Sequence, residues 1–376
     1  MTERKTEIEF QTHSYVLYMQ DKYDAYRSWL RQENLPAYNG EFVLDVRDVE
    51  LGDWPRRKGR GAFLEFRDQN VSECYVCEIP PGGSLTPQRQ MFEEIVVVAS
   101  GHGATTLWWD EGSPRHTFEW TRGSLFAIPL NCNYEHINTS GDEPARFLAL
   151  TDAPVTWELY RDPEFIFHND FQFRDRFDPD ISDFYSRPGK YLTEYYGGIL
   201  DTSFIADLRE VKLTPRSKRG AGTMNMYIHL AGSTMFAHIS EFPVGTYKKA
   251  HRHGPGAHIY TLDSTGYTLM WKDGEEPQRY DWSEGSVISP SAGYWHQHYN
   301  TGHRPAKFVA LHASVALRGD ASDGPREQLP FEYEDAALRE MYVEECRKSG
   351  VEVKMKDPRQ AASPTSRPVS TPEIAR

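Results

Sequence analysis

The sequence is poor in cysteine and in positive charge, and it lacks any long apolar run. Its 376 residues include 4 cysteines, and 42 Lys and Arg stand against 55 Asp and Glu, for a formal net charge of −13. This acidic balance argues against nucleic acid as a partner, because phosphate contacts need a basic face. No stretch reaches the roughly 18 apolar residues of a membrane-spanning helix, so we expect no membrane partner.

The cysteines and the N-terminus together favour a cytoplasmic location. Cys74 and Cys77 form a lone CxxC pair in a strand-like stretch, and no second pair follows. We therefore expect buried, reduced thiols. The first ten residues, MTERKTEIEF, are charged and hold no apolar segment of a secretory signal.

What the sequence does have is aromatic content and length. Aromatic residues make up 13% of the chain and hydrophobic residues 39%, which is typical of a globular protein rich in β-structure. A chain of 376 residues suits two domains, each large enough to bury a core.

Histidines cluster at the ends of two short β runs between Gly245 and Asn300. The first run ends in His251-Arg-His253 and the second in His296-Gln-His298. Side chains alternate across a strand, so each pair leaves from a single face. If the two runs are neighbours, His251, His253 and His296 converge on one point. Imidazole is the commonest ligand for Fe, Ni, Zn and Cu, and three such ligands leave positions open for water, O2 or substrate.

The stretch from residue 72 to residue 152 repeats this pattern without its histidine pair. Gly82 precedes Gln88 and Gln90 as Gly245 precedes His251 and His253. An internal duplication at low identity follows from this match. Glutamine amides are poor ligands for a transition metal, so the first unit is expected to have lost its metal. Its His136 aligns with His296 by one anchor and with His298 by another, and the spacing leaves this open.

At these residues the chain resembles the cupin superfamily. The first cupin signature, glycine then His-x-His, glutamate and glycine, is carried by Gly245, His251, His253 and Gly266, with His258 at the glutamate position. The second signature is carried by the following residues: Gly285, Pro290, Gly293, His296 and Asn300. The resemblance implies an all-β bicupin, with two double-stranded β-helix (jelly-roll) barrels and peripheral helices.

The expected domains follow from the two signatures. They are an N-terminal helix and arm (1–71), a degenerate first barrel (72–152), a connecting segment (153–205), a metal-binding second barrel (206–320) and a C-terminal helix with a tail (321–376). Three- and four-residue apolar spacing predicts helices over 15–33 and 334–348. The connecting segment is too aromatic for a disordered linker, and we expect it to pack across the barrels and wall the site.

His258 and His298 are candidates for catalysis beside the metal. His258 is either a fourth ligand or a group that moves protons near pH 7. His298 shares the face of His296, which favours hydrogen bonding or substrate contact over ligation.

Three further residues are predicted to bind substrate. Lys249 shares the parity of His251, Tyr260 shares that of His258, and Trp295 is next to a ligand. Neutral ligands leave the metal charge uncompensated, so a small anionic substrate is expected.

Among cupins, the histidine pattern resembles that of the gentisate and salicylate ring-cleaving dioxygenases. That family holds Fe(II) on three histidines and lacks the cupin glutamate, which makes a non-haem Fe(II) dioxygenase acting on a small aromatic or enolic acid the first expectation. The alternatives are an O2-independent lyase, decarboxylase or isomerase using Mn, Ni or Zn, and a non-catalytic binding cupin. A homodimer or homotetramer is expected, because bicupins expose sheet faces and edges.

Overall fold

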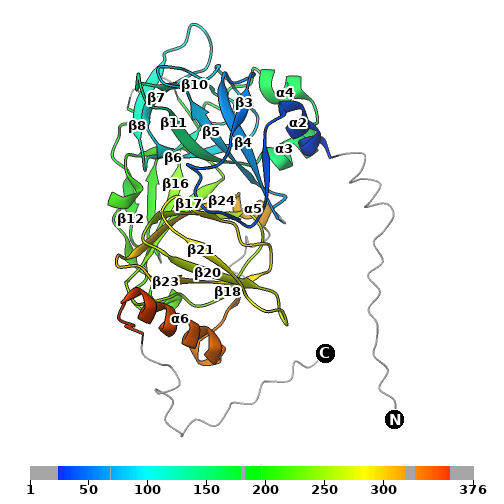
Figure 1. The fold of residues 1–376 in the computed structure, drawn as a ribbon. Coiled ribbons are helices and arrows are strands. Elements are labelled where there is room, and N and C mark those ends of the chain that lie inside the picture. The colour runs from blue at the N-terminus through cyan, green and yellow to red at the C-terminus, as the bar shows by residue number, and fades with distance from the viewer. Residues whose placement is uncertain (1–23, 68, 179–182, 196, 319–326, 356–376) are drawn as a thin grey trace, which may run out of the picture.

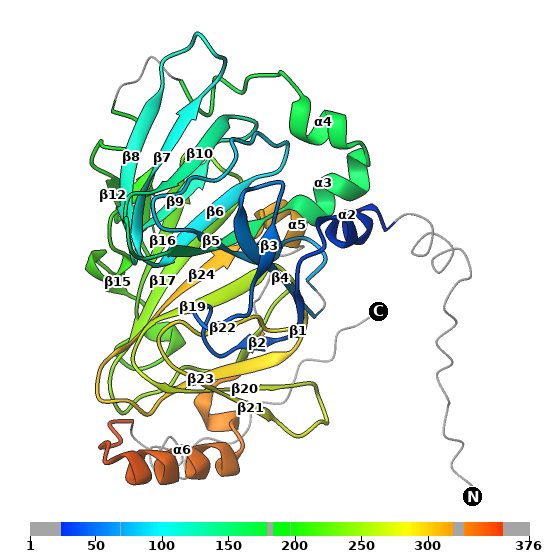
Figure 2. The same cartoon turned by 45° about the horizontal axis from the view of Figure 1, so that its top comes forward.

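The computed structural model describes residues 24–67, 69–178, 183–195, 197–318 and 327–355. The chain forms two β-barrels stacked one on the other, with helices at the periphery (Figures 1 and 2). Each barrel is built from one large and one small sheet, which is the two-sheet jelly-roll arrangement. The pairing is antiparallel except for β1 with β4 and β13 with β16, which are parallel. The predicted all-β architecture of two jelly-roll barrels with peripheral helices is confirmed.

The first barrel pairs an eight-stranded sheet with a three-stranded one. The large sheet runs β1-β4-β5-β11-β6-β9-β14 with β3 beside β4, and the small sheet runs β10-β7-β8. Its strands are β1 (Ala37–Gly40), β3 (Gly52–Trp54), β4 (Gly59–Phe66), β5 (Glu73–Ile79), β6 (Glu94–Ser100), β7 (His102–Trp108), β8 (His116–Thr121), β9 (Leu125–Ile128), β10 (Asn133–Asn138), β11 (Ala145–Thr151) and β14 (Phe204–Ile205).

The second barrel pairs a nine-stranded sheet with a five-stranded one. The large sheet runs β12-β13-β16-β17-β24-β19-β22-β2 with β15 beside β16, and the small sheet runs β21-β20-β23-β18-β25. Its strands are β2 (Phe42–Val43), β12 (Lys190–Leu192), β13 (Ile199–Thr202), β15 (Thr214–Pro215), β16 (Met224–Leu230), β17 (Phe236–Phe242), β18 (His251–Arg252), β19 (Ala257–Asp263), β20 (Gly266–Trp271), β21 (Gln278–Trp282), β22 (Val287–Ile288), β23 (Trp295–Asn300), β24 (Ala306–His312) and β25 (Glu327–Gln328).

The two barrels exchange a strand, which moves the predicted boundaries. β2 lies between β1 and β3 of the first barrel in the chain but pairs with β22 of the second, and β14 lies between β13 and β15 of the second barrel but pairs with β9 of the first. Each exchanged strand is followed by an Asp-x-Arg ion pair, Asp45–Arg47 at 2.6 Å and Asp207–Arg209 at 2.8 Å. The strands before them match as well, because β1 pairs parallel with β4 and β13 pairs parallel with β16. The duplicated unit therefore begins near residues 37 and 199. Within the described part of the predicted arm 1–71, β1, β3 and β4 complete the sheet of the first barrel, so these strands belong to that barrel and not to a separate arm.

The two predicted helices are present in the described residues. α2 (Ala25–Glu33) covers the second half of the predicted 15–33 helix, and the first half lies outside the described residues. Its Trp29 stacks on Trp157 at 5.2 Å between ring centroids. α6 (Ala336–Ser349) begins at the cap residue Asp335 and ends at Gly350, whose φ of 69° is the left-handed conformation that favours glycine.

The aromatic connecting segment contacts both barrels, because its helices and aromatic residues pack on the first barrel while β12 and β13 join the large sheet of the second. It forms α3 (Ala153–Tyr160) and α4 (Pro163–His168), which lie beside α2 in Figure 2. Tyr185 stacks on Phe118 with the ring centroids 4.1 Å apart, and Phe177 packs against Trp109 with the ring centroids 5.8 Å apart. The prediction that this segment is ordered is therefore correct. The remaining short helices are α5 (Val315–Arg318) and single turns at Leu208–Glu210, Ser217–Arg219 and Phe331–Tyr333.

Two expectations from composition can be compared with the structure. All four cysteines are buried and free of disulfides, as predicted. Within the described ranges, no helix combines the length and the apolar character needed to cross a membrane.

Candidate metal centre

Three histidines of the second barrel converge as their spacing predicts. β18 pairs antiparallel with β23, and this pairing puts His251 directly opposite His296. The ring nitrogens of His251, His253 and His296 that are able to bind a metal all lie within 4.8 Å of one another. His251 and His296 come from paired strands of the small sheet, and His253 follows directly after the end of β18.

The hydrogen bonds around these rings suit them to metal binding. His253 Nδ1 lies 2.7 Å from the Gly254 carbonyl and His296 Nδ1 lies 3.1 Å from the Tyr294 carbonyl. A carbonyl oxygen only accepts, so each Nδ1 must carry the hydrogen and each Nε2 keeps its lone pair. Such carbonyl contacts orient metal-bound histidines in proteins.

Burial keeps the third ring neutral. It lowers the pKa of His251 well below the ordinary value, and the nearby Arg219 and the neighbouring histidines lower it further. Among the described residues, His251 Nδ1 is buried and has no hydrogen-bond partner. Neutral imidazoles with free lone pairs are what a divalent transition metal requires, so the residues present fit such an ion.

A one-residue bulge precedes the first histidine pair. Tyr247 faces Tyr299 and His251 faces His296, so residues 248–250 lie between the two pairs on one side and residues 297–298 on the other. The extra residue inverts the alternation, and Lys248 rather than Lys249 shares the face of His251. Lys248 Nζ is buried and donates to Ser240 Oγ at 2.7 Å.

The prediction that Lys249 contacts substrate is therefore wrong. Its ammonium lies 5.4 Å from the centre of the Phe331 ring, and Lys249 does not line the histidine pocket. The parity argument assumed a regular strand between Lys249 and His251, and the bulge breaks it.

His258 does not occupy the cupin glutamate position. β6 begins with Glu94 opposite Thr151, and β19 begins with Ala257 opposite His312, so Ala257 is the equivalent of Glu94. His258 is one residue further and points to the opposite face. Its ring nitrogens lie 3.1 Å from Ser72 Oγ and 3.0 Å from Ser289 Oγ, between the barrels. The expectation that His258 is a ligand or a proton carrier at the metal is wrong for this reason.

The other two predicted substrate contacts also point away from the site. Tyr260 shares the face of His258 and is buried in the core that extends from the first barrel. Trp295 donates through Nε1 to Asp273 at 2.8 Å, and the Arg252 guanidinium lies 4.7 Å from its ring centre. Neither residue lines the pocket beside the three histidines.

His298 does lie beside the three histidines. Its ring centroid is 5.7 Å from that of His296, and its Nδ1 is 2.8 Å from Thr268 Oγ1. Burial and the positive charge of Lys248 lower the pKa of His298 well below the ordinary value. The ring is therefore neutral and available for a hydrogen bond to a bound molecule.

A pocket between the two sheets contains the three histidines and several residues that sequence reasoning missed. Its lining includes the cationic groups Arg216, Arg219 and Lys248, together with His238 and His312 on the facing sheet. The local sequence around His238 does not show which side of its strand faces inward, and nothing local marks the two arginines. No described residue of the connecting segment lines this pocket, so the expectation that it walls the site is wrong.

The pocket is electrostatically positive. Burial lowers the pKa of Lys248 well below the ordinary value, and Arg219 and Arg216 lower it further. Among the described residues that line the pocket, none is an aspartate or a glutamate. A bound anion would relieve this repulsion and raise the pKa of Lys248.

The first barrel carries the degenerate copy of the site. Gln88 faces Tyr134 as His251 faces His296, so a tyrosine replaces the third histidine. His136 Nδ1 lies 2.7 Å from Thr105 Oγ1, as His298 lies against Thr268. His136 is therefore the equivalent of His298, which resolves the open alignment.

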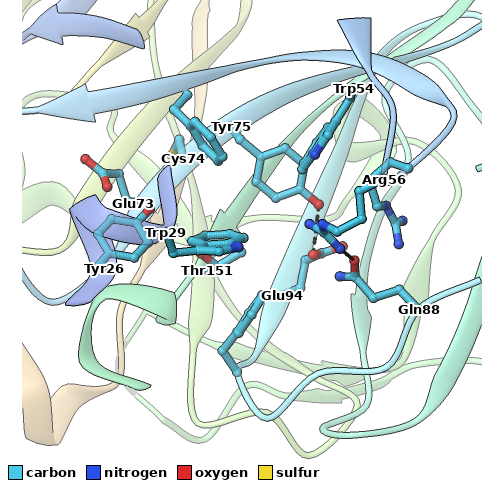
Figure 3. A pocket seen from close by; sticks show the side chains of 13 residues that line it. Tyr26, Trp29, Trp54, Arg56, Glu73, Cys74, Tyr75, Gln88, Glu94 and Thr151 are labelled. Carbon is cyan, nitrogen blue, oxygen red and sulfur yellow. Dashed lines mark hydrogen bonds between the residues drawn. The ribbon is translucent and has the colours of Figure 1, made fainter. Parts of the chain in front are cut away.

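Hydrogen bonds between side chains replace metal ligation in the first barrel. Figure 3 shows Tyr75 donating to Glu94, at 2.8 Å, and Arg56 donating to Gln88. Gln90 Nε2 donates to Glu94 at 3.2 Å. In the described part of the chain, the only cluster of three or more metal-binding side chains is the one in the second barrel.

The chain was compared with known proteins. No protein-family model and no curated protein matches it. Among solved structures it is similar to a mutant form of Bacillus subtilis oxalate decarboxylase OxdC, with a TM-score of 0.47 and 13% identity over 73% of this chain and 77% of that one.

Two other solved structures are similar to the same degree. The formate complex of Lactobacillus farciminis oxalate decarboxylase has a TM-score of 0.48 and 12% identity over 81% of this chain and 93% of that one. A Bacillus subtilis oxalate decarboxylase structure from work on its Mn(II) centres has a TM-score of 0.47 and 12% identity over 81% and 84%. These similarities are too low to transfer an activity.

Proposed function

We propose that this chain is a metal-dependent bicupin enzyme that acts on a small carboxylate in its second barrel, by O2-independent lyase, decarboxylase or isomerase chemistry. The observation that carries the proposal is a three-histidine metal set that faces a cationic pocket between the two sheets. Mn, Ni, Zn or Fe are the candidate ions, since each accepts imidazole ligands.

The charge of the site supports an anionic substrate. Three neutral histidines contribute no negative charge to a divalent ion, and Arg216, Arg219 and Lys248 add positive charge nearby. A carboxylate that binds here compensates the charge of the metal and that of the cationic side chains. Lys248, which donates to Ser240 Oγ in this structure, is placed to donate a hydrogen bond to the bound carboxylate. When bound, the metal supplies Lewis-acid polarisation of a carboxylate or carbonyl oxygen.

The shape of the lining favours a small aliphatic acid over an aromatic one. Apart from histidines, the aromatic residues that line the pocket are Tyr227 and Phe308, and the aromatic connecting segment contributes none. Phe308, Ile259 and Ala310 supply apolar surface that excludes water around the bound group. An aromatic substrate would be expected to meet a broader aromatic wall.

A second candidate is the non-haem Fe(II) dioxygenase expected from the histidine pattern. It is supported by the orientation of His258, which points away from the three histidines and so leaves positions for a bidentate acid and O2. The same small pocket then has to hold both ligands.

The test is turnover of a panel of acids by protein reconstituted separately with Mn(II) and with Fe(II). The panel contains oxalate, malonate, a 2-oxo acid and hydroxybenzoates, each assayed in air and anaerobically while O2 uptake and CO2 release are recorded. We expect turnover of a small aliphatic acid that persists without O2. Stoichiometric O2 uptake with a hydroxybenzoate would decide for the dioxygenase.

A further inference from the structure

Two histidines from the large sheet line the same pocket from the side opposite the metal set. A hydrogen bond joins Nδ1 of His238 on β17 to Nε2 of His312 on β24, with 2.8 Å between the two nitrogens. The two rings are stacked, with their centroids 4.9 Å apart. Phe236 stacks on the His312 ring at 4.6 Å. His251 and His296 come from the small sheet and His253 follows directly after β18, so a molecule bound at the metal would lie between the two groups.

Comparison of the two barrels shows what this pair replaces. Tyr75 faces Ala149 in the first barrel as His238 faces Ala310 in the second, so Tyr75 and His238 are equivalent. Tyr75 donates to Glu94 at 2.8 Å. The second barrel has Ala257 at the position of Glu94, and its neighbour across the ladder is His312.

The ionisable partner of Tyr75 is Glu94 on β6, whereas the ionisable partner of the equivalent His238 is His312 on β24. In the first barrel it is a carboxylate bonded to a phenol, and in the second it is an imidazole bonded to an imidazole. The exchange removes the negative charge from the pocket and introduces a group that can take up and return a proton near neutral pH.

We propose that the His238–His312 pair is the proton-transfer group of the second-barrel site; this inference rests on the function proposed above. Two imidazoles that share one hydrogen bond take up a single proton between them, because a second would place two positive charges 2.8 Å apart. In a decarboxylation, the bond to the departing carboxylate breaks and CO2 leaves. The electron pair stays on the remaining carbon and takes the proton of the pair. The pair is then neutral, and it takes up its next proton from the solvent when another carboxylate binds.

Binding of the anion prepares the pair for this step. The charged and titratable groups that face the pocket are Arg216, Arg219, Lys248, Tyr227 and the metal-binding histidines with His298. In the absence of an anion their positive charge opposes protonation of the pair. A bound carboxylate offsets this charge, so the pair takes up a proton as the substrate binds.

The experiment measures this proton uptake directly. Oxalate is titrated into the Mn(II)-loaded full chain by calorimetry in two buffers of different ionisation enthalpy, which gives the number of protons taken up on binding. The variants are His238→Gln, His312→Gln and the double substitution. His229→Gln is the matched control, because His229 is exposed on β16 and pairs with Asp201. Lys248 is unchanged in all of these proteins, so any proton that it takes up on binding is counted equally in each of them.

We expect the wild type and the control to take up about one proton more than either single variant. Mn(II) content should be unchanged, and turnover of the accepted acid should fall about 100-fold to 10,000-fold. The double variant should match the single ones, since the two rings act as one unit. Equal proton uptake by wild type and His312→Gln would overturn the inference alone. Failure of the wild type to bind any acid of the panel would overturn the proposed function and this inference with it.

Discussion

His251 lies directly opposite His296 across the antiparallel pairing of β18 and β23, with their ring centroids 4.0 Å apart. The same ladder position in the first barrel holds Gln88 opposite Tyr134. One fold therefore presents the same backbone site twice, once with imidazoles and once with side chains that hydrogen-bond to each other. The difference lies in side-chain chemistry and not in backbone geometry.

The first prediction concerns metal stoichiometry. We expect one divalent metal per chain, bound in the second barrel. His251→Ala should lose it, because two remaining histidines seldom hold a transition metal. Gln88→Ala should keep full occupancy, since that residue lies outside the three-histidine cluster. Elemental analysis of purified protein measures both, and two metals per chain would contradict the assignment.

The second prediction separates Lys248 from Lys249. Lys248→Met should weaken binding of oxalate to the metal-loaded protein about 10-fold to 100-fold, because a buried charge-assisted hydrogen bond is lost. Lys249→Met should change affinity less than about twofold, since its ammonium lies over Phe331 outside the pocket. Calorimetry on the two variants provides the comparison. The reverse order of effects would mean that the bulge is misplaced.

The third prediction concerns the vacant glutamate position. Ala257→Glu places a carboxylate where Glu94 stands in the first barrel, and it should raise metal affinity by about 10-fold or more by adding a charged ligand.

His258→Ala should leave metal content unchanged and lower the free energy of unfolding by about 1 to 3 kcal/mol, because buried hydrogen bonds to Ser72 and Ser289 are lost. Loss of metal in His258→Ala would restore that residue as a ligand.

The fourth prediction is a pH dependence of stability that arises far from the metal. Burial raises the pKa of Glu73 to about 8 from 4.5, against the hydrogen bond from Tyr26 that lowers it. Between these values the folded state holds more protons than the unfolded state. The protonated Glu73 therefore contributes fully to the free energy of unfolding below about pH 4.5. This contribution is lost as the pH rises through 8, at a rate of at most about 1.4 kcal/mol per pH unit.

Replacing Glu73 by glutamine tests this contribution. Glu73→Gln should leave the free energy of unfolding little changed at pH 5 and raise it relative to wild type at pH 8.5. Urea denaturation of the two proteins at both pH values measures the difference. Parallel pH profiles for the two proteins would show that the carboxyl group titrates normally.

The fifth prediction concerns assembly. We expect a homodimer or a homotetramer, because the large sheets end in exposed edges and α3 and α4 expose Leu159, Tyr160 and Phe165. Light scattering at micromolar concentration gives the mass in solution. A monomer at that concentration would refute the expectation.

The sequence by itself determined the duplicated barrel, the converging histidines and the replacement of the histidine pair by Gln88 and Gln90 in the first unit. These features follow from residue spacing within short segments, where glycine positions and the alternation of a strand are local properties. The helix that ends at Gly350 was predictable for the same reason, because its cap residues lie within the segment itself.

Only the tertiary structure decided which side chains surround the metal set. A single bulged residue before His251 exchanged Lys248 for Lys249, and a one-residue offset in β19 put Ala257 into the pocket in place of His258. Alternation predicts a face only while the pairing register is unbroken, so one extra residue inverts every assignment beyond it. The His238–His312 pair likewise depends on β17 and β24 meeting across 74 residues of chain, which no local pattern specifies.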